Sequence, residues 1–263
     1  MSLITLTSAA GAPGVTTTAL ALALAWPRPV LLVEADPSGG SALLAGYLRG
    51  RIPHHRSLVD LGVAQRQGRL AEALSEVTVD LPDSSVHLIP GARSHAQAGT
   101  VTSIMEPLTT ALRGLDRNGV DVIVDAGRLG MQDYPTPLRD RADLALLLMR
   151  TTLPAVGAAR GWAKKLRSEF EAAGSLDNLA AVLVGEGHPY TERQVAKVIP
   201  LPIATTLAWD PVSAEVYHLG SPRRRRFDAS PLPRSITAAV SAFNSTIAAN
   251  KAQLMAARPL EGA

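Results

Sequence analysis

Short, almost wholly apolar runs alternate along the chain with longer stretches that repeat apolar residues at helical spacing. Apolar runs without polar alternation are typical of parallel strands buried on both faces of a sheet. We expect seven strands, at Leu3–Leu6, Val30–Val33, Val86–Ile89, Val120–Val124, Leu144–Met149, Leu179–Val184 and Leu201–Thr206. Helices are expected between them, at Thr16–Trp26, Val101–Leu115, Ala155–Ala173 and Thr191–Val198. This alternation predicts a doubly wound α/β fold, with a mostly parallel sheet, helices on both faces and three α/β/α layers.

The chain has no internal repeat and no long linker, so we expect one domain over residues 1–263. A chain of this length can bury a sizeable core by itself. The stretch 220–233 is rich in Pro, Arg and Ser, which is typical of a loop. A closing helix is expected over 234–258, and its Leu254 and Met255 are expected to pack on the body of the protein.

The composition excludes several classes of protein. Hydrophobic residues make up 46% of the chain, which is too many for a disordered segment. No apolar run reaches the roughly 18 residues that a membrane span requires, and no secretory leader is apparent at the N-terminus. The absence of cysteine excludes disulfides and thiol chemistry, and together these features favour a cytoplasmic protein.

Positive charge gathers in one short run, formed by Arg223, Arg224, Arg225 and Arg226. The net charge of +3 is too small to indicate nucleic-acid binding by itself. The arginine run could bind DNA phosphates, an anionic lipid surface or a partner protein, or it could lie in solvent. Because the run is short and has no interleaved aromatic residues to stack on bases, a protein partner or solvent is favoured over nucleic acid.

A glycine-containing segment, Ala9–Thr18, follows the first expected strand and opens the first expected helix. Backbone N–H groups in such a loop and the positive end of the helix dipole together form an anion site. The alternative is that Gly11 and Gly14 only make a tight turn, with Thr16 or Thr17 capping the helix.

Carboxylates follow two further strands of the predicted sheet. Glu34 and Asp36 come after the second strand, and Asp125 comes after the fourth. Because the carboxyl ends of parallel strands meet at one edge of a sheet, we expect these side chains to converge on the glycine loop. The hydroxyl of Thr16 would then join Asp36 and Asp125 as oxygen ligands for Mg²⁺. The alternatives are ordinary solvation of Glu34 and Asp36, and a hydrogen bond from the loop backbone to Asp125.

These motifs resemble the ParA/MinD family of P-loop ATPases with a deviant Walker A loop, of the SIMIBI class, and the likeness extends over nearly the whole chain. The family's K-G-G-x-G-K-T-T loop falls on Ala10–Thr17. The resemblance implies that nucleotide phosphates contact Gly11, Ala12, Pro13, Gly14, Val15, Thr16 and Thr17. The family's D-x-D-P pattern is similar to Glu34–Pro37, which gives Asp36 the role of positioning the attacking water. Its D-V-I-V-D segment is similar to Asp121–Asp125, with Asp125 on the metal side.

The chain departs from the family at its most important charges. The lysine that reaches across the dimer corresponds to Ala10, and the phosphate-loop lysine corresponds to Val15. Since a charge-assisted hydrogen bond contributes about 1.5–3 kcal/mol, losing two costs about 3–6 kcal/mol, or about two to four decades in affinity. Gly185 also stands where many members have an asparagine that contacts adenine. Three arginines are candidates for a substitute cation: Arg128, Arg139 and Arg141.

The resemblance therefore implies a degenerate ATPase, or pseudo-ATPase. It would act as a positioning, scaffold or regulatory factor for a pilus, secretion or division apparatus, as TadZ/CpaE-like members do. One alternative is an active switch that dimerises on ATP with Mg²⁺ and hydrolyses it slowly, and another is a ParA-like partition protein that binds DNA. Protein partners and a homodimer are expected from the family. MinD-type proteins end in a basic membrane helix, whereas this chain has only Lys251 and Arg258 there, so no direct membrane anchor is expected.

Overall fold

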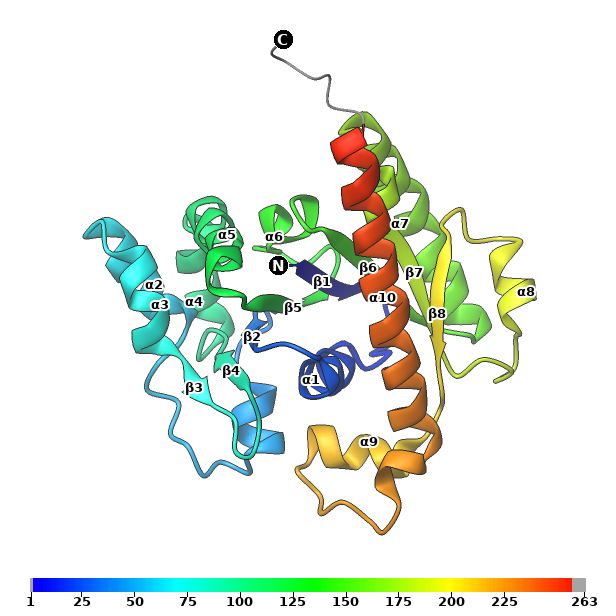
Figure 1. Cartoon of the computed structure of the whole chain (residues 1–263), viewed down its shortest axis with the longest axis horizontal. Helices are drawn as coiled ribbons and strands as arrows, with labels where there is room; N and C mark the ends of the chain where they lie inside the picture. Colours follow the sequence, from blue (N-terminus) through cyan, green and yellow to red (C-terminus); the bar gives the residue numbers. More distant parts are fainter. Residues whose placement is uncertain (1, 257–263) are drawn as a thin grey trace.

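An eight-stranded sheet runs through the middle of the molecule in the computed structural model, which describes residues 2–256 (Figure 1). Its strands are β1 (Leu3–Ser8), β2 (Val30–Glu34), β3 (Val79–Asp80), β4 (Val86–Ile89), β5 (Asp121–Arg128), β6 (Leu144–Arg150), β7 (Leu179–Val184) and β8 (Ile203–Leu207). They lie in the order β3-β4-β2-β5-β1-β6-β7-β8. All pairs are parallel except β3 with β4. The predicted fold class is confirmed, and all seven expected strands are present.

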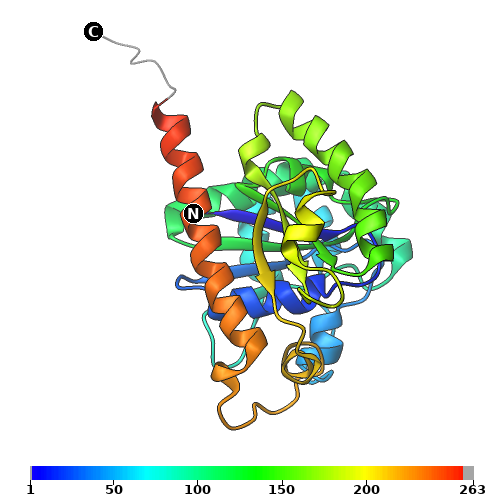
Figure 2. The same cartoon turned by 90° about the vertical axis from the view of Figure 1, so that its right-hand side faces the viewer.

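Helices cover both faces of this sheet and complete three layers (Figure 1 and Figure 2). One face carries α1 (Val15–Ala25), the π-helical turn η1 (Leu43–Tyr47), α9 (Pro211–His218) and α10 (Pro231–Ala256). The other carries α2 (Leu58–Arg66), α3 (Leu70–Val77), α4 (His95–Thr102), α5 (Met105–Gly114), α6 (Thr136–Asp140), α7 (Leu153–Ala172) and α8 (Glu192–Ala196). Short 3₁₀ turns occur at η2 (Leu115–Asn118), η3 (Leu176–Asn178) and η4 (Phe227–Ala229).

The central strand β1 is buried on both faces, as the apolar runs in the sequence predict. All six of its residues are buried, because α1 and α10 lie over one face of the sheet and α6 and α7 over the other. The strand pairs with β5 on one side and β6 on the other. Its carboxyl end therefore opens into the glycine loop next to the carboxyl end of β5.

The predicted helix over Val101–Leu115 is two helices rather than one. The first ends at Thr102 and the second begins at Met105. Pro107 has no N–H and cannot continue a helix from the preceding turn, so it is tolerated only in the first turn of a new one. The last predicted strand also begins later than expected, at Ile203, because Pro202 cannot donate to the sheet ladder.

The C-terminal expectations need two corrections. Helix α10 begins at Pro231, so the last three residues of the expected 220–233 loop are helical, since proline fits the first turn of a helix. The end of the expected 234–258 helix, with Arg258, lies outside the described residues. Leu254 and Met255 do not pack on the body: they are 62% and 76% exposed, because α10 extends past the other elements (Figure 1). Within residues 2–256, no helix is both long and apolar enough to cross a membrane.

Candidate functional site

The glycine loop between β1 and α1 is a left-handed turn that leaves the helix N-terminus open. Gly11, Ala12 and Gly14 have φ values of +76°, +43° and +93°. Gly14 caps α1, and no side chain accepts a hydrogen bond from the first turn. The interpretation of Thr16 or Thr17 as a capping residue is therefore wrong.

The loop presents backbone N–H groups that have no acceptor within residues 2–256. Among the described residues, no N–H group from Gly11 to Thr17 donates a hydrogen bond, and the first that does is Thr18, to the carbonyl of Gly14 at 2.8 Å. These unpaired donors lie at the positive end of the α1 dipole. An anion of phosphate size and chemistry fits this place.

Asp125 joins the loop to the end of β5. Its Oδ2 accepts a hydrogen bond from the Thr16 hydroxyl at 2.5 Å, and its Oδ1 accepts one from the Gly127 N–H at 3.0 Å. Burial raises the pKa of Asp125 to about 6; the Asp36 charge adds to the rise, and the Thr16 hydrogen bond opposes it. The alternative in which Asp125 accepts from the glycine-loop backbone is wrong, since its donors are a side chain and its own turn.

Asp36 approaches the same place from the end of β2. A Cβ built on Gly127, whose φ is +63°, would lie 2.3 Å from Asp36 Cγ, so the carboxylate rests directly on that glycine. Asp36 also accepts a hydrogen bond from the Ser38 N–H at 2.8 Å. The structure thus brings Thr16, Asp36 and Asp125 together, as the carboxyl-end rule predicts.

Glu34 is buried at the start of η1, does not line the cleft and is not solvated. It is 4% exposed and accepts hydrogen bonds from the Ser41 hydroxyl, the Leu43 N–H at 3.0 Å and the Gly91 N–H at 3.4 Å. Burial raises its pKa to about 7, against the lowering effect of these hydrogen bonds, with a smaller rise from Asp125. Glu34 therefore holds the start of η1 in place.

Of the three candidate cations, one lies at the site. Arg139 is buried and pairs with Asp140 and with Glu169 at 2.9 Å, while Arg141 pairs with Glu106 at 3.1 Å. Arg128 is exposed and lines the cavity described next, and its guanidinium donates to Met131 Sδ at 3.1 Å.

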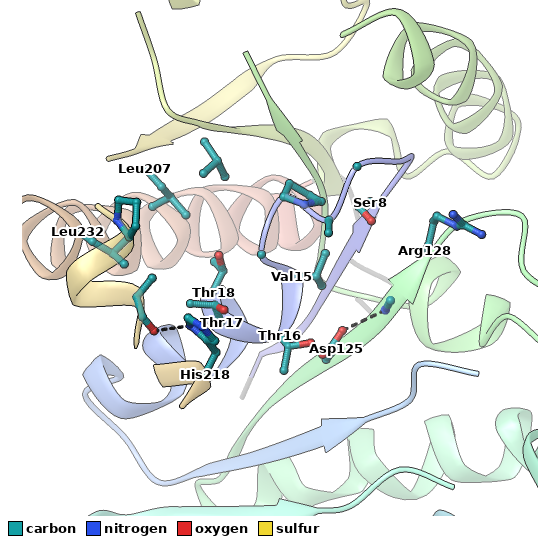
Figure 3. Close-up of a pocket in the computed structure, with 18 of the residues that line it drawn as sticks. Ser8, Val15, Thr16, Thr17, Thr18, Asp125, Arg128, Leu207, His218 and Leu232 are labelled. Atoms are coloured by element: carbon teal, nitrogen blue, oxygen red, sulfur yellow. Dashed lines mark hydrogen bonds between the residues drawn. The ribbon is translucent and has the colours of Figure 1, made fainter. Parts of the chain in front are cut away.

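A cavity of about 800 Å³, called the cleft below, extends from the glycine loop to the β8–α9 segment. Figure 3 shows the loop residues between Arg128 on one side and His218 and Leu232 on the other. The far wall includes Trp209, whose ring lies 3.8 Å below the Arg150 guanidinium. A Cβ on Gly185 would lie 3.3 Å from Trp209 Cβ, so the tryptophan packs closely against the end of β7.

The sequence interpretation missed this far wall. Its residues come from the segment after β8, a strand end that the carboxyl-end rule also covers, but Ala208–Pro211 matches none of the motifs considered. Asp210 fixes this segment by accepting from the Ser213 N–H at 3.1 Å and the Leu232 N–H at 3.4 Å.

The residues of the cleft fit a magnesium nucleotide. The Thr16 hydroxyl and the carboxylates of Asp36 and Asp125 are hard oxygen donors, and Mg²⁺ is commonly held by one or two carboxylates together with substrate phosphates. The unpaired loop N–H groups fit the phosphates, and the cavity volume fits a small-molecule ligand. Val15, at the loop-lysine position, lines the cleft, packs on the core and is 7% exposed. Its apolar side chain contributes no charge to the site.

Arg223, Arg224, Arg225 and Arg226 lie elsewhere, on the exposed segment between α9 and α10. None of them lines the cleft. Arg223 lies over the Phe227 ring at 5.4 Å. The segment borders the cleft without lining it, since Arg224 acts electrostatically on Asp210 of the far wall.

No protein-family model matches the sequence, and no curated protein matches it. Solved structures do match the fold. MinD from Pyrococcus horikoshii complexed with Mg-ADP superposes with a TM-score of 0.71 at 18% identity, over 94% of this chain and 97% of that one. A ParA family ATPase from Chlorobium tepidum gives 0.72 at 18% identity, over 92% and 99%. The Aquifex aeolicus MinC:MinD cell division complex gives 0.68 at 16% identity, over 100% and 99%. The chain therefore has the fold of the MinD and ParA ATPases.

Proposed function

We propose that this chain is a degenerate ATPase of the ParA/MinD type that positions or regulates a larger protein assembly without turning over ATP. One observation carries the proposal: the cleft is intact, but the loop-lysine position holds Val15, an uncharged residue that lines the cleft and packs on the core. Ala10 replaces the second lysine. The residues that would bind a nucleotide remain, whereas the two lysine charges expected at positions 10 and 15 are absent.

The loss affects hydrolysis more than binding. In phosphoryl transfer the loop lysine stabilises charge that develops on the transferring group, so its absence raises the barrier directly. Arg128 lies at the rim of the cleft and is the one cation among the three candidates that can reach a ligand there. A single exposed arginine at the rim contributes to affinity but does not reproduce the geometry of a lysine within the loop.

We expect weak binding of a magnesium nucleotide to persist. The unpaired loop N–H groups, Thr16, Asp36 and Asp125 support it, and the solved MinD of this fold is complexed with Mg-ADP. When bound, Mg²⁺ supplies charge neutralisation for the phosphates. The residues themselves orient it, since Thr16 and Asp125 are already in contact and Asp36 is fixed against Gly127.

The proposal includes protein partners, a homodimer and a cytoplasmic location. A solved MinD of this fold is in complex with MinC, which supports partner binding as the output of such a chain. With ATP turnover lost, partner recruitment would depend on the shape of the protein and on nucleotide occupancy alone.

Calorimetric titration with a non-hydrolysable ATP analogue and Mg²⁺ tests the binding part. Weak binding that disappears in both Thr16→Ala and Asp125→Ala supports the proposal. No heat at millimolar ligand overturns the binding part and leaves the fold as a docking surface only. Tight binding accompanied by ATP turnover overturns the proposal as a whole.

The second candidate is an active switch that dimerises on ATP and hydrolyses it slowly. The preformed Thr16–Asp125 contact favours it, because this pair persists although the lysines are gone. Light scattering at saturating Mg-ATP separates the two candidates. An ATP-dependent dimer that reverts to monomer as phosphate is released supports the switch, whereas an oligomeric state that ATP leaves unchanged excludes it.

A further inference from the structure

A second, smaller cavity of about 270 Å³ lies between the segment around η1 and the segment that follows α9. The apolar part of its wall includes Leu48, Ile52, Pro82 and Val216. Three arginines also line it: Arg49, Arg51 and Arg223. We call this cavity the arginine pocket.

The two segments that form the pocket pack backbone to backbone, which makes its walls rigid. A Cβ on Gly220, whose φ is +61°, would lie 2.1 Å from the carbonyl oxygen of Tyr47. A Cβ on Gly46 would lie 2.0 Å from the carbonyl oxygen of His218. No larger residue fits at either contact without movement of backbone, so the pocket is built into the fold.

Two of the pocket arginines, Arg49 and Arg223, are held in place without being neutralised. Arg49 has a φ of +53° and donates from Nε to the Leu219 carbonyl at 3.3 Å. Arg223 lies over Phe227, whose ring in turn packs on Tyr217 with centroids 5.8 Å apart. No carboxylate within residues 2–256 forms an ion pair with any of the three pocket arginines.

The surface around the pocket is also both positively charged and apolar. Arg224, Arg225 and Arg226 are exposed on the chain that continues from it, and Leu219 is 50% exposed beside Arg49. Two acidic groups lie nearby: Asp83 adjoins the wall residue Pro82 and acts on Tyr47, and Asp228 adjoins Phe227 and acts on Tyr217. Positive charge and apolar surface thus occur together at one place.

The geometry points to a docking site for an acidic segment of a partner protein, with one apolar side chain in the arginine pocket and flanking carboxylates on the arginines. An inorganic anion would leave the apolar walls uncovered. A DNA duplex presents phosphates on a broad surface and has nothing to fill a cavity of this size. An acidic peptide with a leucine- or phenylalanine-sized anchor uses both features, and arginine forms bidentate bonds with carboxylates.

This inference rests on the proposed role of the chain in partner binding, and it names the surface and the chemistry of that partner. The arginine pocket lies across α9 from the cleft: Val216 lines the pocket, whereas Glu215 and His218 line the cleft. A nucleotide is not needed to form the pocket. Failure of peptide binding would therefore contradict this inference alone, and failure of nucleotide binding would contradict the nucleotide part of the proposed function alone.

The test is fluorescence anisotropy of the full chain, without nucleotide, with labelled peptides of glutamate, serine and glycine that carry one leucine at varied positions. We expect at least one peptide to bind and to lose affinity by about tenfold or more with Arg49→Glu/Arg51→Glu and with Arg223→Glu. The matched control is Arg160→Glu, an exposed charge reversal on α7 across the sheet, which should change affinity by less than about twofold. Replacing the peptide leucine by serine should weaken binding by about fivefold or more.

Three results overturn the inference. The first is that no peptide binds. The second is that all charge-reversal variants, including the α7 control, weaken binding equally, which indicates only a general charge effect. The third is that a DNA duplex displaces the peptide and binds more tightly, with the same dependence on Arg49, Arg51 and Arg223, which assigns the surface to nucleic acid.

Discussion

The carboxylate of Asp36 lies where any side chain at position 127 would have to be. A Cβ on Gly127 falls 2.3 Å from Asp36 Cγ, and the positive φ of Gly127 also favours glycine. This contact joins the segment after β2 to the segment after β5, beside the Thr16–Asp125 hydrogen bond. The arrangement of acidic groups in the cleft therefore depends on one glycine.

Gly127→Ala should displace Asp36 as well as strain the backbone. We expect it to lower the free energy of unfolding by about 1–3 kcal/mol more than Gly119→Ala, because the added methyl collides with a carboxylate. Gly119 is a matched control, since its φ is +71° and a Cβ there meets no atom within 4 Å. Urea unfolding of both variants measures the difference, and equal losses would show that Asp36 moves aside at no cost.

Val15→Lys should restore affinity for a magnesium nucleotide. A charge-assisted hydrogen bond to phosphate contributes about 1.5–3 kcal/mol, so we expect about 10- to 150-fold tighter binding by calorimetry. Ala25→Lys, at the exposed far end of α1, adds the same charge and should leave affinity unchanged. If both variants bind no more tightly than the original chain, the loop does not hold phosphate.

Arg128→Ala should weaken nucleotide binding by about tenfold or more, because Arg128 is the candidate cation that lines the cleft. Arg141→Ala is the control: it removes an arginine paired with Glu106, away from the cavity, and should have no effect on affinity. Titration of the three proteins with the same ATP analogue measures this. Equal affinities would exclude Arg128 as a phosphate contact.

Stability should fall as the pH rises through the range set by Glu34. Its pKa is about 7 in the folded protein and 4.5 ordinarily, so the folded state binds this proton more tightly. The stabilising contribution is complete below about pH 4.5 and is lost as the pH rises through about 7, a change of about 3 kcal/mol. Asp125, with a pKa of about 6, acts in the same direction.

Glu34→Gln should therefore flatten the dependence of unfolding free energy on pH between about 4.5 and 7. Denaturant unfolding at a series of pH values measures the slope. Glu72→Gln, an exposed carboxylate on α3, should leave the slope as it is. An unchanged slope in Glu34→Gln would mean that Glu34 is ionised throughout and does not govern stability there.

The fold could be predicted from the sequence because the sheet is buried on both faces. Strand β7 is wholly apolar, and all six residues of β1 are buried although three of them are Thr or Ser, so neither strand shows the alternation of a half-exposed sheet. The two-residue strand β3 is too short for such a run and was not expected. The exposure of Leu254 was also not predicted, because periodicity within a helix cannot show where the body beneath it ends.

The phosphate side of the cleft could be predicted because its residues come from motifs at the ends of β1, β2 and β5. The opposite wall could not, since Trp209 and Arg150 lie 59 positions apart and meet only through the pairing of β6, β7 and β8. The same applies to the arginine pocket, where Arg49 and Arg223 are brought together by the contact of η1 with α9. Contacts of this kind carry no local signal in the chain.

The most direct test of the account is the rate of phosphate release from Mg-ATP by the purified chain, measured beside Asp36→Ala. Asp36 is the residue that would position the attacking water, so the variant defines the background. We predict that the original chain, which lacks both lysines, releases phosphate no faster than Asp36→Ala at saturating ATP. A clear rate that Asp36→Ala abolishes would contradict it and establish the chain as a working ATPase.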